Sequence, residues 1–150
     1  METGIKKVVI LVFLISLVLA LVSGCTPTPI SKEPSVEITF IQSPMLTGEK
    51  NDPCMDTLVT NPSQGQIYSE VYFKLIDLDS QGRILNEDIY EDPFYLSPGY
   101  QEEFHWWCTF YLQPGWYTRI VQLITPGSDG TVGTSDDVIL AEDRADFELK

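Results

Sequence analysis

The chain has 150 residues, with 9 lysines and arginines against 22 aspartates and glutamates, and its net charge at neutral pH is −13. This length suffices for one domain with a hydrophobic core. A surface this acidic repels the phosphates of nucleic acids and of anionic lipids, so we expect no nucleic-acid partner. It favours solubility and attracts divalent cations.

Residues 1–24 have the pattern of a signal peptide. Lys6 and Lys7 precede an uncharged apolar run from Val8 to Leu21, as a basic region precedes the helical apolar region of such peptides. Even extended to Gly24, the run only reaches the lower limit for a membrane span. It is followed by Val22-Ser23-Gly24-Cys25, which resembles the lipobox of prokaryotic lipoproteins.

The resemblance implies that the chain is cut before Cys25 and that a lipid such as palmitate is attached to the Cys25 sulfur. A thiolate is the nucleophile that such a thioether requires, and two or more acyl chains anchor a protein stably. We therefore expect an extracytoplasmic protein, held by lipid on the cell membrane or the outer membrane. The alternative is an uncleaved signal anchor with an incidental cysteine. Residues 25–34 are rich in proline and predict an extended tether.

The two remaining cysteines, Cys54 and Cys108, form an even number in an oxidising compartment. We therefore predict a disulfide between them. It closes a loop of about 55 residues and contributes about 4 kcal/mol on the chain-entropy account. Two free thiols or a metal pair are the alternatives, but the sequence has no CxxC spacing, and the single histidine, His105, gives only weak support for a metal.

From residue 35 to residue 150, short β-type segments alternate with turns, and no segment has a helical period. The predicted strands are 35–42, 54–61, 68–79, 83–90, 100–112, 116–125 and 137–150. We expect a loop at 42–53 and a turn at 95–99. About seven strands without helices between them favour one all-β domain, an antiparallel two-layer sandwich.

Several motifs resemble prokaryotic extracellular immunoglobulin-like domains of the FxLYD-like and CARDB-like groups. Phe73 to Asp77 match the FxLYD pattern, except that isoleucine replaces the tyrosine, and Leu96 to Gly99 resemble a turn of these domains. Leu112 to Tyr117 resemble a tyrosine corner. An immunoglobulin disulfide would place a cysteine where Arg119 stands. The resemblance implies an immunoglobulin-like sandwich that binds or spaces rather than catalyses, with any Cys54–Cys108 bridge within one sheet or between a loop and a sheet.

The loop from Pro126 to Val138 is rich in aspartate and glycine. The carboxylates of Asp129, Asp136 and Asp137 are oxygen ligands of the kind that calcium prefers. The register of an EF-hand is missing, so the alternative is a solvated hairpin loop. We keep both interpretations: no cofactor, or calcium in this loop.

The segment from 100 to 112 is rich in aromatic residues, and strand alternation places Trp106 on the core face with Phe104. Trp107 is then exposed and is the candidate for stacking on a carbohydrate, with ordinary sheet packing as the alternative. A second acidic cluster, Glu87 to Asp92, is typical of an edge strand protected by charge.

The sequence has no GxSxG, HExxH or phosphate-binding loop, and we do not expect an enzyme. We expect a lipid-anchored, non-catalytic binding or spacer module. Its partners are the membrane, through the lipid on Cys25, and an unidentified protein or polymer of the cell envelope. The alternative is a module that binds carbohydrate or calcium directly.

Overall fold

The computed structural model describes residues 33–150. The predicted signal peptide, the lipidation site Cys25 and most of the tether lie outside the described residues. Within the described part, no helix has the length and apolar character that crossing a membrane requires.

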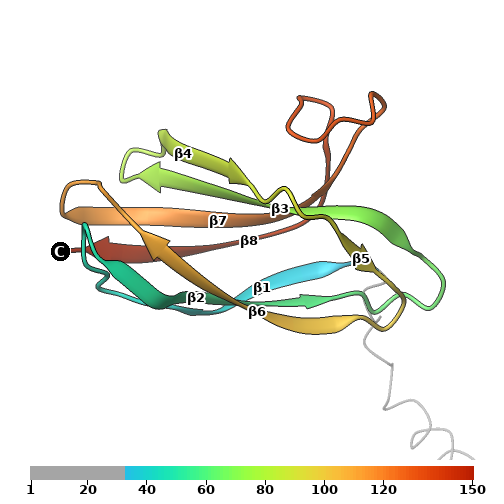
Figure 1. Ribbon diagram of the computed structural model, residues 1–150, viewed down its shortest axis with the longest axis horizontal. Coiled ribbons are helices and arrows are strands. Elements are labelled where there is room, and N and C mark those ends of the chain that lie inside the picture. The colour runs from blue at the N-terminus through green and yellow to red at the C-terminus, as the bar shows by residue number, and fades with distance from the viewer. Residues whose placement is uncertain (1–32) are drawn as a thin grey trace, which may run out of the picture. The chain divides into compact units, whose positions relative to one another are not determined.

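The described chain folds into two antiparallel β-sheets that lie on one another as layers (Figure 1). The strands are β1 (Ser35–Ile41), β2 (Lys50–Thr60), β3 (Tyr68–Asp79), β4 (Ile84–Ile89), β5 (Phe94–Leu96), β6 (Gln101–Thr109), β7 (Gly115–Thr125) and β8 (Val138–Leu149). One sheet has the order β1-β2-β6, and the other has the order β4-β3-β7-β8, with β5 also paired to β3. The predicted all-β antiparallel sandwich is confirmed.

Most predicted strands are found with ends shifted by a residue or so, the strand predicted at 100–112 ends at Thr109, and two regions expected to be loop or turn contain strand residues. The expected turn at 95–99 begins within β5, which pairs with the start of β3 at Tyr68 and Val71. Pro93 interrupts the strand that borders β3, and the chain then returns to the same edge as a separate short strand. The expected loop at 42–53 contains the start of β2, because Lys50 and Asn51 pair with the end of β6. The sandwich therefore has eight strands.

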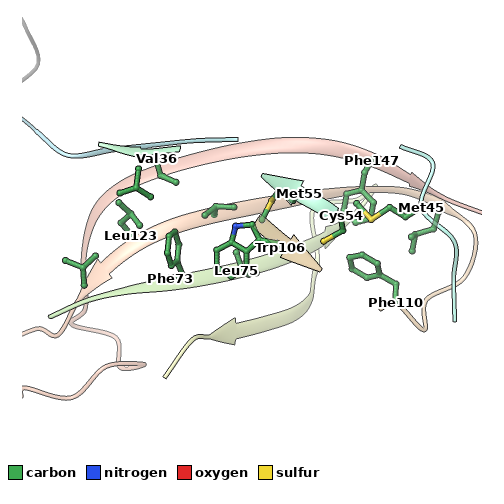
Figure 2. Close-up of a cluster of buried hydrophobic side chains, with 14 of the residues drawn as sticks. Val36, Met45, Cys54, Met55, Phe73, Leu75, Trp106, Phe110, Leu123 and Phe147 are labelled. Atoms are coloured by element: carbon green, nitrogen blue, oxygen red, sulfur yellow. The ribbon is translucent and has the colours of Figure 1, made fainter. Parts of the chain in front are cut away.

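Alternating apolar residues fill the space between the sheets (Figure 2). Val71, Phe73 and Leu75 project from β3, and Val121 and Leu123 project from the neighbouring β7. This is the period-two pattern of a strand with one buried face. The ring of Phe73 packs edge-on against Trp106 of the opposite sheet, with 4.9 Å between ring centroids. Burial of these side chains holds the two sheets together.

The edge formed by β1 and β8 is closed by backbone hydrogen bonds. The Met45 amide donates to the Glu148 carbonyl at 2.8 Å, and the Lys150 amide donates to the Met45 carbonyl at 2.9 Å. The Ile38 amide donates to the Asp143 carboxylate at 2.7 Å. The segment after β1 therefore crosses to the second sheet and continues along β8, where Met45 is fully buried.

The opposite edge is formed by β4 and β6, which are terminal strands of their sheets. Cys108, near the end of β6, is joined to Cys54 of the adjacent strand β2 by the predicted disulfide. The bridge lies within one sheet, at the irregularity in the β2–β6 pairing between Asn51 and Met55. It fastens the edge strand β6 to the interior of its sheet.

The tyrosine-corner interpretation of Tyr117 agrees with a specific contact. The Tyr117 hydroxyl donates a hydrogen bond of 2.6 Å to the carbonyl of Gln113, four residues upstream. At the other end of the sandwich, the buried Asn61 side chain donates to the carbonyls of Gln66, Leu96 and Ser97. These contacts fix the turns that lead into β3, β6 and β7.

Candidate functional site

A cavity of about 180 Å³ lies between the sheets at the open edge formed by β4 and β6. It is bordered by Leu75, Asp77, Asn86, Asp88, Tyr90, Trp106, Trp107, Cys108, Thr109, Phe110 and Arg119. These residues come from β3, β4 and β7 of one sheet, and from β6 and the segments that flank it. We call this cavity the edge cleft. It combines aromatic rings with charged groups in a part of the sandwich that is normally apolar.

The charged centre of the edge cleft is an ion pair between Arg119 of β7 and Asp77 of β3. The two residues are direct neighbours in the β3–β7 register. Arg119 Nε and Nη2 donate to the two carboxylate oxygens of Asp77, each at 2.8 Å, and the side chains are only 5% and 2% exposed. The guanidinium also lies over the ring of Phe110, 4.9 Å from its centroid. Bidentate geometry offsets the desolvation of both charges.

Tyr90 and Trp106 connect the two sheets across the edge cleft. Tyr90 follows β4 and packs edge-on against Trp106 of β6, with 4.7 Å between centroids. The Trp106 indole N–H donates to Thr57 Oγ1 at 2.9 Å, so the ring has a fixed position. Burial raises the pKa of the Tyr90 hydroxyl; the nearby negative charge of Asp88 also raises it, and the positive charge of Arg119 opposes the shift. The Tyr90 hydroxyl thus lies in the electrostatic field of both charged groups.

The sequence predicted that Trp106 faces the core and that Trp107 is exposed, and the structure agrees on both. Trp106 is 8% exposed and Trp107 is 63% exposed. Both border the edge cleft because β6 is the last strand of its sheet. Lys50 Nζ lies 5.1 Å from the centroid of the Trp107 ring, and the same ammonium is paired with Asp52 at 2.8 Å. Trp107 is therefore exposed at the border of the edge cleft.

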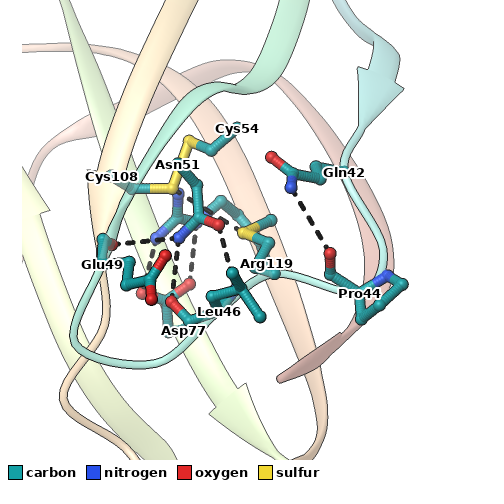
Figure 3. Close-up of a disulfide and its surroundings, with 10 residues drawn as sticks. Gln42, Pro44, Leu46, Glu49, Asn51, Cys54, Asp77, Cys108 and Arg119 are labelled. Carbon is teal, nitrogen blue, oxygen red and sulfur yellow. Dashed lines mark hydrogen bonds and ion pairs between the residues drawn. A yellow bond between two sulfur atoms is a disulfide. The ribbon is translucent and has the colours of Figure 1, made fainter. Parts of the chain in front are cut away.

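The Cys54–Cys108 disulfide lies close to Asn51 and to the Asp77–Arg119 pair (Figure 3). The buried Asn51 side chain accepts from the Leu46 amide and donates to the carbonyls of Leu46 and Glu49, and so holds the turn before β2. Cys108 borders the cavity, and its bridge to Cys54 limits how far β6 can move. The wall around Arg119 is thus held by a covalent bond as well as by packing.

The aspartates of the 126–137 loop serve as hydrogen-bond acceptors within the loop. Asp136 accepts from Ser128 Oγ at 2.9 Å and from the Thr134 hydroxyl, Asp137 accepts from the Gly133 amide, and Asp129 accepts from the Thr131 amide. Among residues 33–150, no group of three histidine, cysteine or acidic side chains is placed to hold a metal ion. One oxygen of the set, Asp137 Oδ1, is buried without a hydrogen-bond partner, and calcium binding by Asp129, Asp136 and Asp137 stays a prediction.

The hydrogen bonds within this loop also change the pKa of one of its aspartates. Hydrogen bonds from Thr134 and Ser128 lower the pKa of Asp136 to about 2. A Cβ atom added at Gly127 would lie 2.1 Å from the Asp136 carbonyl oxygen, so only glycine permits this approach. The loop projects from the sandwich between β7 and β8 (Figure 1) and is ordered by its own contacts.

Two further features lie away from the edge cleft. His105 of β6 pairs with Asp56 of β2 at 2.8 Å on the exposed face of the sheet, and the hydrogen bond that the ring donates to the Asp56 carboxylate raises the pKa of His105. A second depression, of about 380 Å³, lies beside Trp116 on the other sheet and includes Asp79 and Arg144. None of the residues that border this depression is buried.

Comparison with known proteins agrees with the fold. No protein-family model matches the chain, and no curated protein matches its sequence. The structure is similar to the C-terminal domain of Wzt, with a TM-score of 0.57 and 12% identity over 78% of this chain and 70% of that chain. It is also similar to Spo0M, a sporulation control protein from Bacillus subtilis, with a TM-score of 0.51 and 13% identity over 79% of this chain. The matched region spans only 49% of Spo0M.

At this level of identity the similarities concern the fold alone. Together with the sheet order, they define the chain as a β-sandwich protein of immunoglobulin-like architecture. A β-glucosidase from Kluyveromyces marxianus matches with a TM-score of 0.42 over 15% of its length.

The sequence analysis missed Asp77, Arg119, Asn86 and Asp88. A signal for the first two was present, because Asp77 continues the inward alternation of Phe73 and Leu75, as Arg119 continues that of Val121. Charged residues at two inward positions predict either a buried pair or a site. Asp88 was noticed only as part of the acidic cluster from Glu87 to Asp92, and Asn86 had no signal, because the place of both at the cavity depends on how close β4 lies to β6.

Proposed function

We propose that this chain is a lipid-anchored extracytoplasmic protein whose β-sandwich is a non-catalytic binding module for a component of the cell envelope. The anchor is inferred from the lipobox-like residues before Cys25. The binding role is supported chiefly by the edge cleft, where a buried ion pair and exposed aromatic rings border one cavity. A sandwich that only spaced other domains would not require charged groups in its interior.

Binding is a better interpretation of the edge cleft than catalysis. Both oxygens of Asp77 are engaged by Arg119, so this carboxylate is not poised to exchange a proton. The only histidine of the chain, His105, precedes the inward-facing Trp106 and points to the opposite face of β6. Asp88 is exposed at the rim, and the other carboxylate that borders the cavity, Asp77, is already bonded to Arg119 through both oxygens.

The finer assignments are also proposals. The match of Phe73 to Asp77 with the FxLYD pattern favours the FxLYD-like or CARDB-like groups among immunoglobulin-like domains. The contact between Tyr117 and Gln113 agrees with the tyrosine corner implied by this resemblance. In this proposal the membrane is reached through the lipid on Cys25, and the envelope partner contacts the edge cleft.

Metabolic labelling tests the lipid anchor. Cells that express the full chain are grown with radioactive palmitate, and the protein is then isolated and analysed for label and for size. We expect the wild type to carry label and to shorten by the length of the signal peptide, and Cys25→Ala to carry none. Cys54→Ser is the matched control and should keep the label. A mature wild-type protein without label would contradict the anchor.

Site-directed photo-crosslinking tests the partner. A benzophenone amino acid replaces Trp107 at the edge cleft or Trp116 on the other sheet, and each full-length variant is irradiated in envelope vesicles. Both side chains are similarly exposed, at 63% and 60%, so they differ in place rather than in access. We expect a defined adduct from position 107 and none from position 116. The reverse pattern, or no adduct from either position, would contradict a binding role for the edge cleft.

A further inference from the structure

We propose that the edge cleft binds an uncharged saccharide that contacts the exposed rings of Trp107 and Tyr90 at its border and whose hydroxyl groups bond to Asn86, Asp88 and Arg119. This inference rests on the proposed function, because it names the chemical class of the envelope component that the module binds. It is drawn from the charges, the polar groups and the rings that border the cavity.

The charges in and around the edge cleft favour a neutral ligand. Arg119 is neutralised by Asp77, and Lys50 by Asp52, so no uncompensated positive charge is present to hold an anion. The carboxylate of Asp88 would attract an organic cation, but two of the aromatic rings that border the cavity, Phe110 and Trp107, already have a resident cation beside them. Arg119 is 4.9 Å from the centroid of Phe110, and Lys50 is 5.1 Å from that of Trp107.

The polar groups suit a molecule that carries several hydroxyls. Asn86 Nδ2 donates to Asp88 Oδ2 at 2.6 Å, which holds the amide and the carboxylate side by side at the rim. The Arg119 guanidinium has five N–H donors, of which Asp77 receives two from Nε and Nη2. A sugar hydroxyl both donates and accepts, so two neighbouring hydroxyls can bond to a carboxylate and to a guanidinium or amide at the same time.

The aromatic rings provide the apolar part of the site. Tyr90 is 44% exposed and Trp107 is 63% exposed, whereas Trp106 between the sheets is buried and positions Tyr90 through the edge-on contact. One side of a pyranose ring presents C–H groups, and a flat aromatic ring covers such a surface. A volume of about 180 Å³ is small compared with drug-sized pockets and suits a single sugar unit, whose chain can continue into solvent.

The depression beside Trp116 is a weaker candidate, although it is larger and also has an exposed ring. Asp79 is already bonded to Arg83, at 2.6 Å through the Arg83 Nη2 atom, and to backbone amides. No charged side chain that is nine-tenths buried borders it, so nothing in it is held ready for a ligand. Trp116 is therefore a suitable control for Trp107.

The test uses the full chain in mild detergent. Neutral oligosaccharides of hexoses and N-acetylhexosamines are first screened for binding on an array, and those that bind are then titrated by calorimetry. Polygalacturonate is the anionic probe and choline is the cationic probe. We expect binding of at least one neutral oligosaccharide with a dissociation constant below about 1 mM and no binding of the charged probes. Trp107→Ala and Asn86→Ala should each weaken binding about tenfold, whereas Trp116→Ala should change it less than twofold.

The outcomes separate this inference from the proposed function. Suppose that the crosslinking experiment gives an adduct at position 107 but that no neutral oligosaccharide binds even at a concentration of about 10 mM, tenfold above the expected limit for the dissociation constant. The ligand class is then wrong, and the binding module stands. Binding of polygalacturonate or choline through Trp107 likewise overturns the ligand class. A saccharide whose affinity depends on Trp116 and not on Trp107 overturns the assignment to the edge cleft. Near-ultraviolet circular dichroism of each variant verifies that the sandwich is intact.

Discussion

The two lateral edges of this sandwich are built in different ways, and we call the β1–β8 edge the closed side and the β4–β6 edge the open side. On the β1–β8 side, the segment around Met45 bonds along β8 through backbone groups, and Met45 and Leu149 are completely or almost completely buried. On the β4–β6 side, a cavity remains, bordered by the Asp77–Arg119 pair and by Tyr90 and Trp107. The first side resembles a continuous core, whereas the second keeps polar groups where apolar ones would stabilise the fold more.

This contrast separates the part of the molecule that holds the fold from the part that is available for binding. Removing apolar contacts on the closed side should affect stability alone. Changes on the open side should affect stability through charge and the disulfide, and should also affect ligand binding. All the following experiments use the full chain in mild detergent, and the first three follow unfolding by guanidinium with tryptophan fluorescence.

Leu149→Ala tests the closed side and has the largest expected effect. Leu149 is 1% exposed and pairs with Met45 where the two sheets join. Its truncation leaves a cavity, and we expect the free energy of unfolding to fall by up to about 5 kcal/mol. The neighbouring exposed residue gives the control, Lys150→Ala, which should have little effect. A loss below about 1 kcal/mol would show that the closed side does not hold the sheets together.

The double variant Cys54→Ser/Cys108→Ser tests the covalent support of the open side. The bridge spans a sequence separation of 54, so its loss should lower the free energy of unfolding by about 4 kcal/mol through the entropy of the unfolded chain. The same loss should appear when the wild type is reduced with dithiothreitol. Reduction without any shift of the unfolding midpoint would contradict this role.

Asp77→Ala tests the ion pair in the edge cleft. The substitution leaves the buried Arg119 without its counter-charge, and we expect a loss of about 3 kcal/mol in the free energy of unfolding. The matched variant Asp77→Leu/Arg119→Met replaces the pair by apolar side chains of similar size. It should recover most of that stability while abolishing ligand binding. If the double variant unfolds as easily as Asp77→Ala, the pair is structural and the cleft interpretation loses its basis.

The His105–Asp56 pair has the smallest expected effect, because His105 is exposed on the outer face of β6. The hydrogen bond with Asp56 raises the pKa of His105 in the folded state. Protonated His105 therefore adds stability that is fully present below the unfolded pKa of about 6.5 and is lost as the pH rises through the higher folded value. We expect the melting temperature of wild type minus that of His105→Gln to decrease between pH 5.5 and 8.5. A constant difference would contradict the pairing.

The architecture followed from local patterns in the sequence. The bounds of β3 were predicted from the alternation of Val71, Phe73 and Leu75, and the same rule distinguished Trp106 from Trp107. The disulfide was predicted from the even number of remaining thiols and the expectation of an oxidising compartment. Such features depend on the period of a strand or on composition, both of which are visible without knowing which strands are neighbours.

The edge cleft could not be predicted in the same way. Asp77 and Arg119 meet only because β3 and β7 pair in a particular register, and Asn86 reaches the cavity only because β4 lies at the same edge as β6. β5 was missed for a related reason, since a strand of three residues is recognised by its partner rather than by its own period. Tertiary neighbours, not local propensity, determine these features.

Amide hydrogen exchange of the full chain, with and without a saturating neutral oligosaccharide, tests the contrast between the two sides most directly. The account predicts added protection in β4 and β6 and in the segment around Tyr90, with unchanged exchange in β1 and β8. Protection confined to β8, to the strands around Trp116 or to the 126–137 loop would contradict it.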